Sequence, residues 1–180
     1  MGKSRVIIRD PVRADAAAFL AAVHRSRALH QGWVSPPRTV QEFSAYLRRV
    51  SGDTHRGFLV LRRDTGELVG VINVSNIIHG AFHSGFLGYY AFANGAGLGF
   101  MEEGMRQVLR IAFRRLKLHR LEANMQPGNR KSMSLVKRCG FVREGYSRRY
   151  LRIAGRWRDH ERWAILAEDY AAQGCGQLTR

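Results

Sequence analysis

The chain has 180 residues, 45% of them hydrophobic, which is enough for one domain with a buried core. Its formal net charge of +16 excludes an acidic surface and fits either solvated arginines or affinity for a polyanion such as ribosomal RNA. The apolar runs are too short to cross a bilayer, and Cys139 and Cys175 are too few for a disulfide framework, so we expect a reduced, cytoplasmic protein without a signal peptide or membrane contact.

The first half of the chain predicts a strand, two helices and a hairpin. Thr39 and Glu42 form a capping box at the start of the second helix, and the loop before it carries Trp33. His79 and His83 lack further ligands at metal spacing, so we expect no metal site. The predicted elements, in order, are a strand at 6–8, a helix at 14–29, a loop at 32–37, a helix at 39–50, strands at 57–62 and 68–74, and a connection at 75–84.

A glycine cluster, Asn94-Gly95-Ala96-Gly97-Leu98-Gly99, is the most informative feature of the chain. An apolar strand at 86–92 precedes it, and a helix with apolar residues at helical spacing follows at 100–116. Glycines let backbone N–H groups converge without clashes of Cβ atoms. The helix adds its free N–H groups and the positive end of its dipole. The cluster therefore predicts a cradle for an anion such as a phosphate or pyrophosphate.

The second half predicts a strand at 119–126, a helix from the N-cap Asn129 to Arg138, and two final antiparallel strands at 141–153 and 157–166. The first of these strands alternates, with Leu121, Ala123 and Met125 on one face and Glu122, Asn124 and Gln126 on the other. The order of elements indicates an α+β fold around one mixed sheet. We expect a single domain over residues 1–180, with a core at about 6–168 and a tail at 169–180.

These elements, in this order and at this spacing, resemble the GNAT superfamily of acyl-CoA N-acyltransferases. Within it they are most similar to the RimJ/RimL branch, which acetylates N-terminal amines of ribosomal proteins. The resemblance covers Val6 to Leu166 and implies a mostly antiparallel sheet with splayed central strands and flanking helices. Besides the glycine loop it is carried by Gly70-Val-Ile-Asn-Val-Ser-Asn76, Leu87-Gly88-Tyr89, Asn129-Arg-Lys-Ser132, Cys139-Gly140-Phe141 and Gly155-Arg-Trp157-Arg-Asp159.

The resemblance implies that acetyl-CoA is the co-substrate, that the glycine loop binds its pyrophosphate, and that its pantetheine arm lies between the splayed strands. The chain supplies the glycines of the family pattern at Gly97 and Gly99, but Asn94 stands where Gln or Arg is usual. Backbone N–H groups still bind phosphate, so we expect binding to persist. The expected cofactor contacts are Tyr89, Tyr90, Ala91, Phe92, Asn94, Gly95, Ala96, Gly97, Leu98, Gly99, Asn129 and Ser132.

Acyl transfer needs a neutral amine, a polarised thioester carbonyl and a proton for the leaving thiolate. The Glu base of some relatives falls at Asn124, which can hold a water, and Glu122 is the nearest carboxylate. The Tyr acid of many relatives falls at Val136, and the RimL-like pattern instead gives this role to Ser132, which is otherwise a capping partner. The Glu base of that branch would fall near Leu151. We therefore expect direct attack by the amine, aided by a water on Asn124 or Glu122.

The acceptor side is less defined by the sequence. Trp33 either lines the acceptor cleft or packs its own loop, and we also assign Asn76 and Tyr146 to acceptor binding. Glu144 and Asp159 match family positions where a structural role is at least as frequent as catalysis. Cys139 is expected to be a small buried hydrophobic residue.

We conclude from the sequence that the chain is an acetyl-CoA-dependent N-acetyltransferase acting on the N-terminal amine of a protein, preferably a ribosomal one. One alternative acceptor is a small-molecule or natural-product amine. Another alternative is a GNAT domain without catalysis that binds a ribosome or RNA. If the chain acetylates a ribosomal protein, or if it binds a ribosome without catalysis, we expect the basic second half to contact the ribosome or its RNA.

Overall fold

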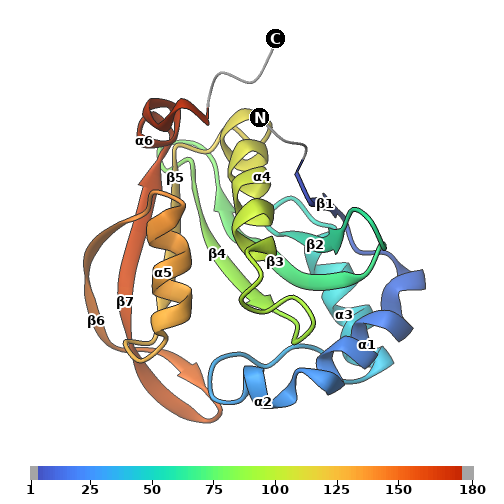
Figure 1. Cartoon of the computed structure of the whole chain (residues 1–180). Helices are drawn as coiled ribbons and strands as arrows, with labels where there is room; N and C mark the ends of the chain where they lie inside the picture. Colours follow the sequence, from blue (N-terminus) through green and yellow to red (C-terminus); the bar gives the residue numbers. More distant parts are fainter. Residues whose placement is uncertain (1–3, 176–180) are drawn as a thin grey trace.

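The computed structural model describes residues 4–175 and contains a seven-stranded sheet in the order β1-β2-β3-β4-β5-β7-β6, with helices on both faces (Figure 1). Neighbouring strands are antiparallel except β4 and β5, which are parallel. The predicted α+β class with a mixed sheet is confirmed. The elements are β1 (Val6–Arg9), η1 (Arg13–Asp15), α1 (Ala16–Arg25), α2 (Arg27–His30), α3 (Val40–Val50), β2 (Arg56–Arg62), β3 (Leu68–Ile78), β4 (Ser84–Ala91), α4 (Phe100–Arg114), β5 (Arg120–Met125), α5 (Arg130–Arg138), β6 (Val142–Ile153), β7 (Arg156–Leu166), α6 (Ala167–Tyr170) and η2 (Ala171–Cys175).

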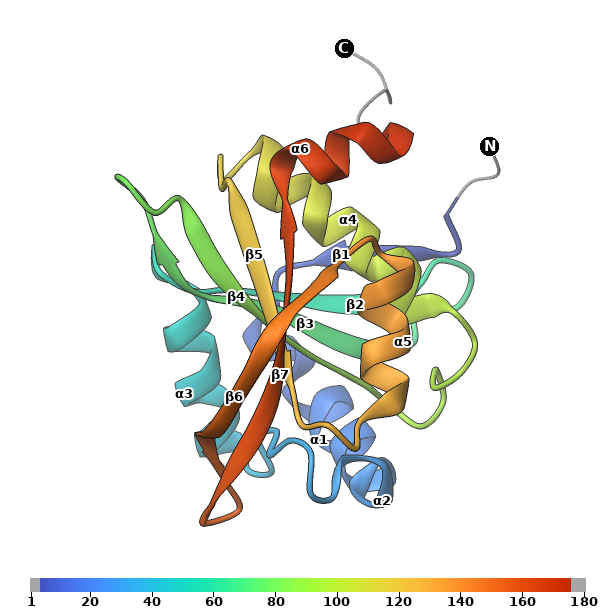
Figure 2. The same cartoon turned by 90° about the vertical axis from the view of Figure 1, so that its left-hand side faces the viewer.

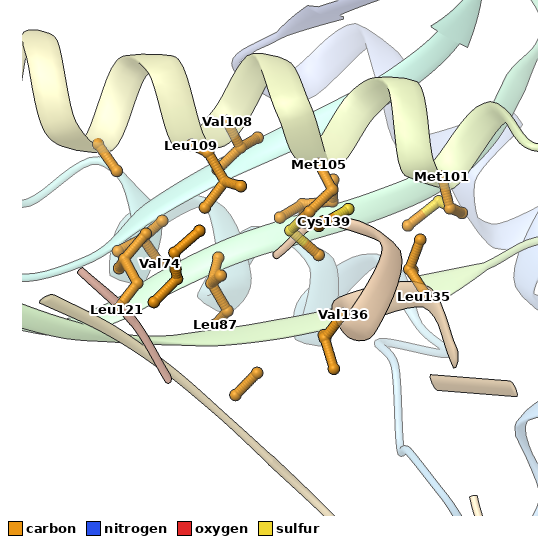
Figure 3. Packing of buried hydrophobic residues seen from close by; sticks show 14 of the residues in the cluster. Val74, Leu87, Met101, Met105, Val108, Leu109, Leu121, Leu135, Val136 and Cys139 are labelled. Carbon is orange, nitrogen blue, oxygen red and sulfur yellow. The ribbon is translucent and has the colours of Figure 1, made fainter. Parts of the chain in front are cut away.

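Two apolar clusters fix the helices to opposite faces of the sheet. Under α4 and α5, side chains of α4 spaced three or four residues apart meet buried side chains of the sheet and of α5 (Figure 3). Helices α1 and α3 lie on the other face (Figure 2), where Phe19 of α1 packs with Phe43 and Tyr46 of α3. Each large apolar side chain buried in this way stabilises the fold by roughly 1.5–3 kcal/mol. We call these the α4/α5 face and the α1/α3 face.

The helix predicted at 14–29 is broken into η1, α1 and α2, so its continuity was predicted wrongly. The break lies at Ser26, whose backbone leaves the helical region at φ −101° and ψ 9°. The Ser26 hydroxyl donates to the carbonyl of Ala22 at 2.7 Å and accepts from the N–H of Ala93 at 2.9 Å. A serine hydroxyl that bonds to backbone competes with the helix. Here it also ties the helix end to the segment that follows β4.

Strand β3 is longer than predicted, because it continues past Val74 to Ile78. The pairing of β3 with β4 shifts between Ser75 and Ile78, and Asn76 in this irregularity has a φ of +49°. The bulge breaks the alternation that would have indicated a strand. The expected connection at 75–84 is therefore only the short turn between β3 and β4.

The central strands splay apart, as the resemblance implied. β4 pairs with β5 only from Ser84 to Leu87, opposite Arg120 to Ala123. Beyond this point β4 continues along β3, and β5 continues along β7 (Figure 1). We call the gap beyond Leu87 and Ala123 the opening.

The residues after β7 form α6 and the short helical turn η2. Tyr170 is buried, and its ring packs against Phe113 of α4 with the ring centroids 5.3 Å apart. Tyr170 thus adds a buried side chain to the α4/α5 face. Within residues 4–175, no helix has both the length and the apolar character needed to cross a bilayer.

Candidate active site

The edge of β4 directs main-chain groups toward the opening. The N–H of Phe92 donates to the carbonyl of Val69 on β3 at 2.8 Å, so Phe92 and Tyr90 direct their main-chain groups to β3. The alternating residues Tyr89 and Ala91 direct theirs toward the opening. From the sequence we expect all of Tyr89 to Phe92 to contact the cofactor. The hydrogen-bond pattern divides these four residues, because Tyr89 and Ala91 face the opening whereas Tyr90 and Phe92 pair with β3.

The side chain of Tyr89 joins β4 to α5. Its hydroxyl donates to the carbonyl oxygen of Ser132 at 3.1 Å and lies 3.3 Å from the sulfur of Met125. Burial raises the pKa of the Tyr89 hydroxyl, which keeps it protonated at neutral pH. This side chain therefore fixes the first turn of α5 beside the opening, on the α4/α5 face.

The glycine loop leads directly into α4, and each glycine has its own reason. A Cβ on Gly95 would lie 2.6 Å from the Cβ of Val69, so only glycine fits there. Gly97 and Gly99 have φ angles of +80° and +84°, in the left-handed region that favours glycine. No heavy atom lies within 4 Å of the position of a Gly97 Cβ. The loop thus presents open backbone at the start of a helix, which suits a phosphate.

Two side chains hold this loop in place. The side-chain amide of Asn94, which replaces the usual Gln or Arg, donates to the carbonyl of Leu68 at 3.1 Å and anchors the loop to β3. Arg5 donates to the carbonyl of Leu98 at 3.1 Å and forms an ion pair with Glu103 at 2.6 Å. A cation from the start of the chain therefore stands beside the loop, which the sequence did not indicate.

Ser132 lies in the first turn of α5, where Asn129 is the N-cap. The side-chain oxygen of Asn129 accepts from the N–H of Ser132 at 3.2 Å. Among residues 4–175 the Ser132 hydroxyl makes no hydrogen bond, and the side chain is half-buried. The capping role thus belongs to Asn129, and the hydroxyl of Ser132 is left for another partner.

Glu122 lies on the α1/α3 face of β5, but its charge is already paired. Arg120 donates to Glu122 at 3.0 Å and makes two hydrogen bonds to Glu144. The hydrogen bonds from Arg120 lower the pKa of Glu144. Glu122 also sits opposite Phe86, within the paired part of β4 and β5. The structure therefore keeps Glu122 outside the opening, whereas Asn124 lies at its beginning.

Asn124 presents an unused hydrogen-bond acceptor. Its amide nitrogen lies 3.4 Å from the hydroxyl of Tyr150 on β6, and its Oδ1 is buried without a partner among the described residues. Gly88 lies across the opening on the same face, and no heavy atom is within 4 Å of its missing Cβ. A buried acceptor without a partner costs free energy. An amine or a water between Gly88 and Asn124 would satisfy it.

The loop after α2 closes one end of the opening. Gln126, just past β5, donates to the carbonyl of Gly32 at 2.9 Å, and the ring of Trp33 lies 3.3 Å from the position of a Gly128 Cβ. His30 donates through Nε2 to the carbonyl of Ala91 at 2.8 Å. The end of α2 is thus bound to β4, and the loop that follows it is bound to the residue after β5. Trp33 lies against the turn between β5 and α5, and its assignment to the acceptor cleft stays a prediction.

Two predicted acceptor residues lie away from this arrangement. Asn76 is exposed in the β3 bulge, beyond the paired end of β4 and β5. Tyr146 is exposed on β6, and its hydroxyl donates to Asp159 at 2.6 Å. The structure therefore brings Asn124, Ser132, Asn129 and the glycine loop around the opening, but neither Asn76 nor Tyr146.

Sequence reasoning missed several residues that the fold brings to the opening. His30, Tyr150 and Arg5 come from segments far from the motifs, and no local pattern marks them. The Tyr89 side chain is a different case, because Tyr89 was chosen for its main chain and its hydroxyl contact depends on α5. Within the described residues, no group of three or more His, Cys, Asp or Glu side chains is arranged to hold a metal ion.

Comparison with known proteins gives consistent matches. The family model described as acetyltransferase (GNAT) domain matches residues 5–142. The probable N-acetyltransferase YjcK of Bacillus subtilis is 36% identical over 129 residues, which are 72% of this chain and 71% of that protein. The ribosomal protein uS5-alanine N-acetyltransferase of Escherichia coli is 40% identical over 107 residues, which are 59% of this chain and 55% of that enzyme. The latter match spans about half of the relative.

Other relatives match over most of their length. The spermidine N(1)-acetyltransferase of Vibrio cholerae is 26% identical over 171 residues, covering 93% of this chain and 96% of that enzyme. The structure of ribosomal-protein-S5-alanine acetyltransferase from Vibrio fischeri has a TM-score of 0.83 and 25% identity, covering 94% of this chain and 97% of that one. Mycobacterium smegmatis RimJ in complex with CoA-disulfide has a TM-score of 0.82 and 26% identity, covering 94% and 89%. The splayed sheet thus has close structural counterparts.

Proposed function

Since this chain belongs to the family of GNAT acetyltransferase domains and is an N-acetyltransferase, we propose that it transfers the acetyl group of acetyl-CoA to the N-terminal α-amine of a protein. Ribosomal proteins are the first candidates, because the relative of known substrate at 40% identity acetylates an alanine of ribosomal protein uS5. We further propose that it acts in the cytoplasm, where such substrates are made.

This proposal rests mainly on which groups near the opening could act as a general base. Asn124, an amide, stands where a base is expected, and the flanking carboxylates Glu122 and Glu161 each form an ion pair with an arginine. An α-amine has a pKa of about 7.7–8.0, so roughly 30% of it is neutral at pH 7.5 without help. An alkyl amine of pKa about 10.4 is only roughly 0.1% neutral. The site therefore suits an α-amine better than a polyamine.

The cofactor assignment rests on two structural features that fit acetyl-CoA. The open backbone of Gly97 to Gly99 at the start of α4 would hold the pyrophosphate, with Arg5 nearby. The main-chain groups of Tyr89 and the N–H of Ala91, whose carbonyl already accepts from His30, would pair with the amides of the pantetheine arm. Acetyl-CoA supplies an activated acyl group as a thioester. The RimJ structure that contains CoA-disulfide supports this assignment.

The proposed chemistry uses the two faces of the opening separately. From the α1/α3 face the neutral amine attacks the thioester carbonyl, while Asn124 Oδ1 accepts an N–H of the amine or an O–H of a water that bridges to the amine. The new C–N bond forms, the C–S bond breaks, and the proton of the amine passes to that water. On the α4/α5 face the Ser132 hydroxyl gives a proton to the departing thiolate and recovers one from solvent. Tyr89 positions Ser132 through its carbonyl.

Peptide acetylation by the purified protein tests this proposal. The peptides carry an N-terminal alanine and one internal lysine, with a version whose α-amine is blocked, and spermidine is a third acceptor. We expect acetylation of the α-amine, with a rate that rises with pH through the pKa of that amine. Acetylation of the lysine or of spermidine at a higher kcat/KM would contradict the proposal. Binding of acetyl-CoA without transfer to any amine would indicate a domain without catalysis.

We also propose a contact with ribosomal RNA through the β6–β7 hairpin. Five arginines in and near its turn are exposed and form no salt bridge within residues 4–175, and the neighbouring Trp157 is 60% exposed. Unpaired guanidinium groups beside an aromatic ring suit a phosphate backbone and its bases. The arginines are Arg148, Arg149, Arg152, Arg156 and Arg158.

A further inference from the structure

A cavity of about 400 Å³ lies between the loop after α2 and helix α3. Prolines of the loop line one side, and Tyr46 and Arg49 of α3 line the other. Arg38 and Glu42, at the start of α3, are the other charged residues of the lining. The cavity is large enough for one or two amino-acid side chains, and none of the roles described above uses it.

The inner wall of this cavity is connected to the opening. The Tyr46 hydroxyl donates to the side-chain oxygen of Asn73 on β3 at 2.8 Å. Asn73 pairs with Gly88, the first residue of β4 beyond its last pair with β5. Gly88 has open space where a side chain would be, on the face that carries Asn124. Tyr46, which lines the cavity, is thus linked through Asn73 to the part of the opening that lies beside Asn124, on the same face.

The charge of the cavity is positive. Arg38 and Arg49 are exposed, and neither forms a salt bridge with any described carboxylate. The Arg49 guanidinium lies 5.7 Å from the centroid of the Tyr46 ring. Glu42 is the sole carboxylate in the described lining. It accepts the backbone N–H of Arg38 at 2.6 Å, at the positive N-terminal end of α3, so its charge is already engaged.

The positive potential reaches the end of β4. Burial is the main cause that lowers the pKa of His30, and Arg38 adds to the lowering. Burial also raises the pKa of Tyr90, and Arg49 opposes that rise. Both arginines thus act on side chains that lie beside the opening. A cationic acceptor would meet these charges, whereas an anionic one would be attracted.

We propose that this cavity holds the residues that follow the acceptor's α-amine and selects acceptors with a carboxylate in their first few positions. The inference rests on the proposed function and names its substrate class. An acidic side chain would pair with Arg38 and Arg49, two cations that have no carboxylate partner in the described structure. Polyamines and lysine-rich N-termini would face the same two cations and be rejected. The positive potential also favours the neutral, reactive form of the α-amine.

The test compares kcat/KM at low salt for three peptides of one length with alanine at the N-terminus. One carries two aspartates near the amine, one carries serines, and one carries lysines; free aspartate is a fourth acceptor. We expect the acidic peptide to exceed the lysine peptide by roughly tenfold or more, since an exposed ion pair contributes up to about fivefold and two are exchanged for repulsion. The R38Q/R49Q variant should lose most of this preference. R48Q, which removes an exposed α3 arginine outside the cavity, should keep it.

The outcomes separate this inference from the proposed function. Equal rates for the acidic and lysine peptides in the wild-type protein would overturn the selection of carboxylates while leaving α-amine acetylation in place. Loss of the preference in R48Q as strongly as in R38Q/R49Q would assign it to net charge and overturn the role of the cavity. Efficient acetylation of free aspartate would replace a peptide acceptor with an amino acid. Failure to acetylate any of the three peptides would overturn the proposed function, and this inference with it.

Discussion

Gly97 concentrates two requirements in one residue, a left-handed backbone and free space for a ligand. Valine at this φ of +80° costs roughly 1–2 kcal/mol and places methyl groups over the backbone that would hold pyrophosphate. We expect Gly97→Val to weaken acetyl-CoA binding at least about tenfold, measured by calorimetry. Gly66→Val is the matched control, because Gly66 also has a positive φ, of +71°, and open space but lies in the turn after β2. Unchanged affinity in folded Gly97→Val would remove the loop from the cofactor site.

Ser132 is a residue whose two possible roles the structure separates. Asn129 caps α5, so Ser132→Ala should change stability little. If the hydroxyl protonates the thiolate, kcat should fall by roughly ten- to a thousandfold with little change in the KM for acetyl-CoA. Ser134→Ala, an exposed change in the same helix, is the control. A kcat equal to that of the wild type, with chemistry as the slow step, would exclude Ser132 as the acid.

The element that joins the acceptor loop to the sheet is α2, through His30. Burial lowers the pKa of His30, so the folded protein holds the ring neutral while the unfolded chain binds a proton below about pH 6.5. Stability should therefore fall as pH drops below that value. His30→Gln keeps a donor for the Ala91 carbonyl without titrating. Its Tm should fall less than that of the wild type between pH 7.5 and 5.5, and equal falls would contradict this account.

At the scale of helices and strands, part of the fold could be predicted from the sequence and part could not. The strand–glycine loop–helix unit and α5 follow from local periodicity and capping, and they lie where predicted. The break at Ser26 and the extension of β3 do not, because a hydrogen bond to Ala93 and a bulge at Asn76 override the local pattern. The first difference arises from a contact with a residue distant in the chain, and the second from an irregular strand pairing, and a single sequence displays neither.

The candidate site likewise contains residues that the sequence could locate and contacts that it could not. Asn124, Asn129, Ser132 and the glycine loop could be placed from spacing and resemblance. The pairing of Glu122 with Arg120 was not visible, although both residues lie on one strand, because the geometry of the cluster depends on Glu144. The cavity on α3 was likewise hidden, since it exists only when the loop after α2 folds over that helix.

At the scale of the whole molecule, the net charge of +16 either serves binding to a polyanion or reflects arginines on a solvated surface. If the β6–β7 hairpin contacts ribosomal RNA, log affinity for RNA should fall with log salt by about 0.7–0.9 per phosphate contact. Acetyl-CoA binding should show a shallower slope. Replacing the five hairpin arginines with glutamine should reduce the RNA slope, whereas replacing Arg110, Arg114 and Arg115 at the end of α4 should not. Equal slopes for both variants would leave the arginines as solvated surface.

The most direct test of the central claim is mass spectrometry of protein N-termini from cells with and without this gene. We predict that one or a few N-termini, those of ribosomal proteins first among them, lose an acetyl group when the gene is deleted and regain it when the gene is restored. Restoration with Ser132→Ala should be incomplete. An unchanged set of acetylated N-termini, with a loss of acetyl groups from lysines, polyamines or other small amines instead, would contradict it.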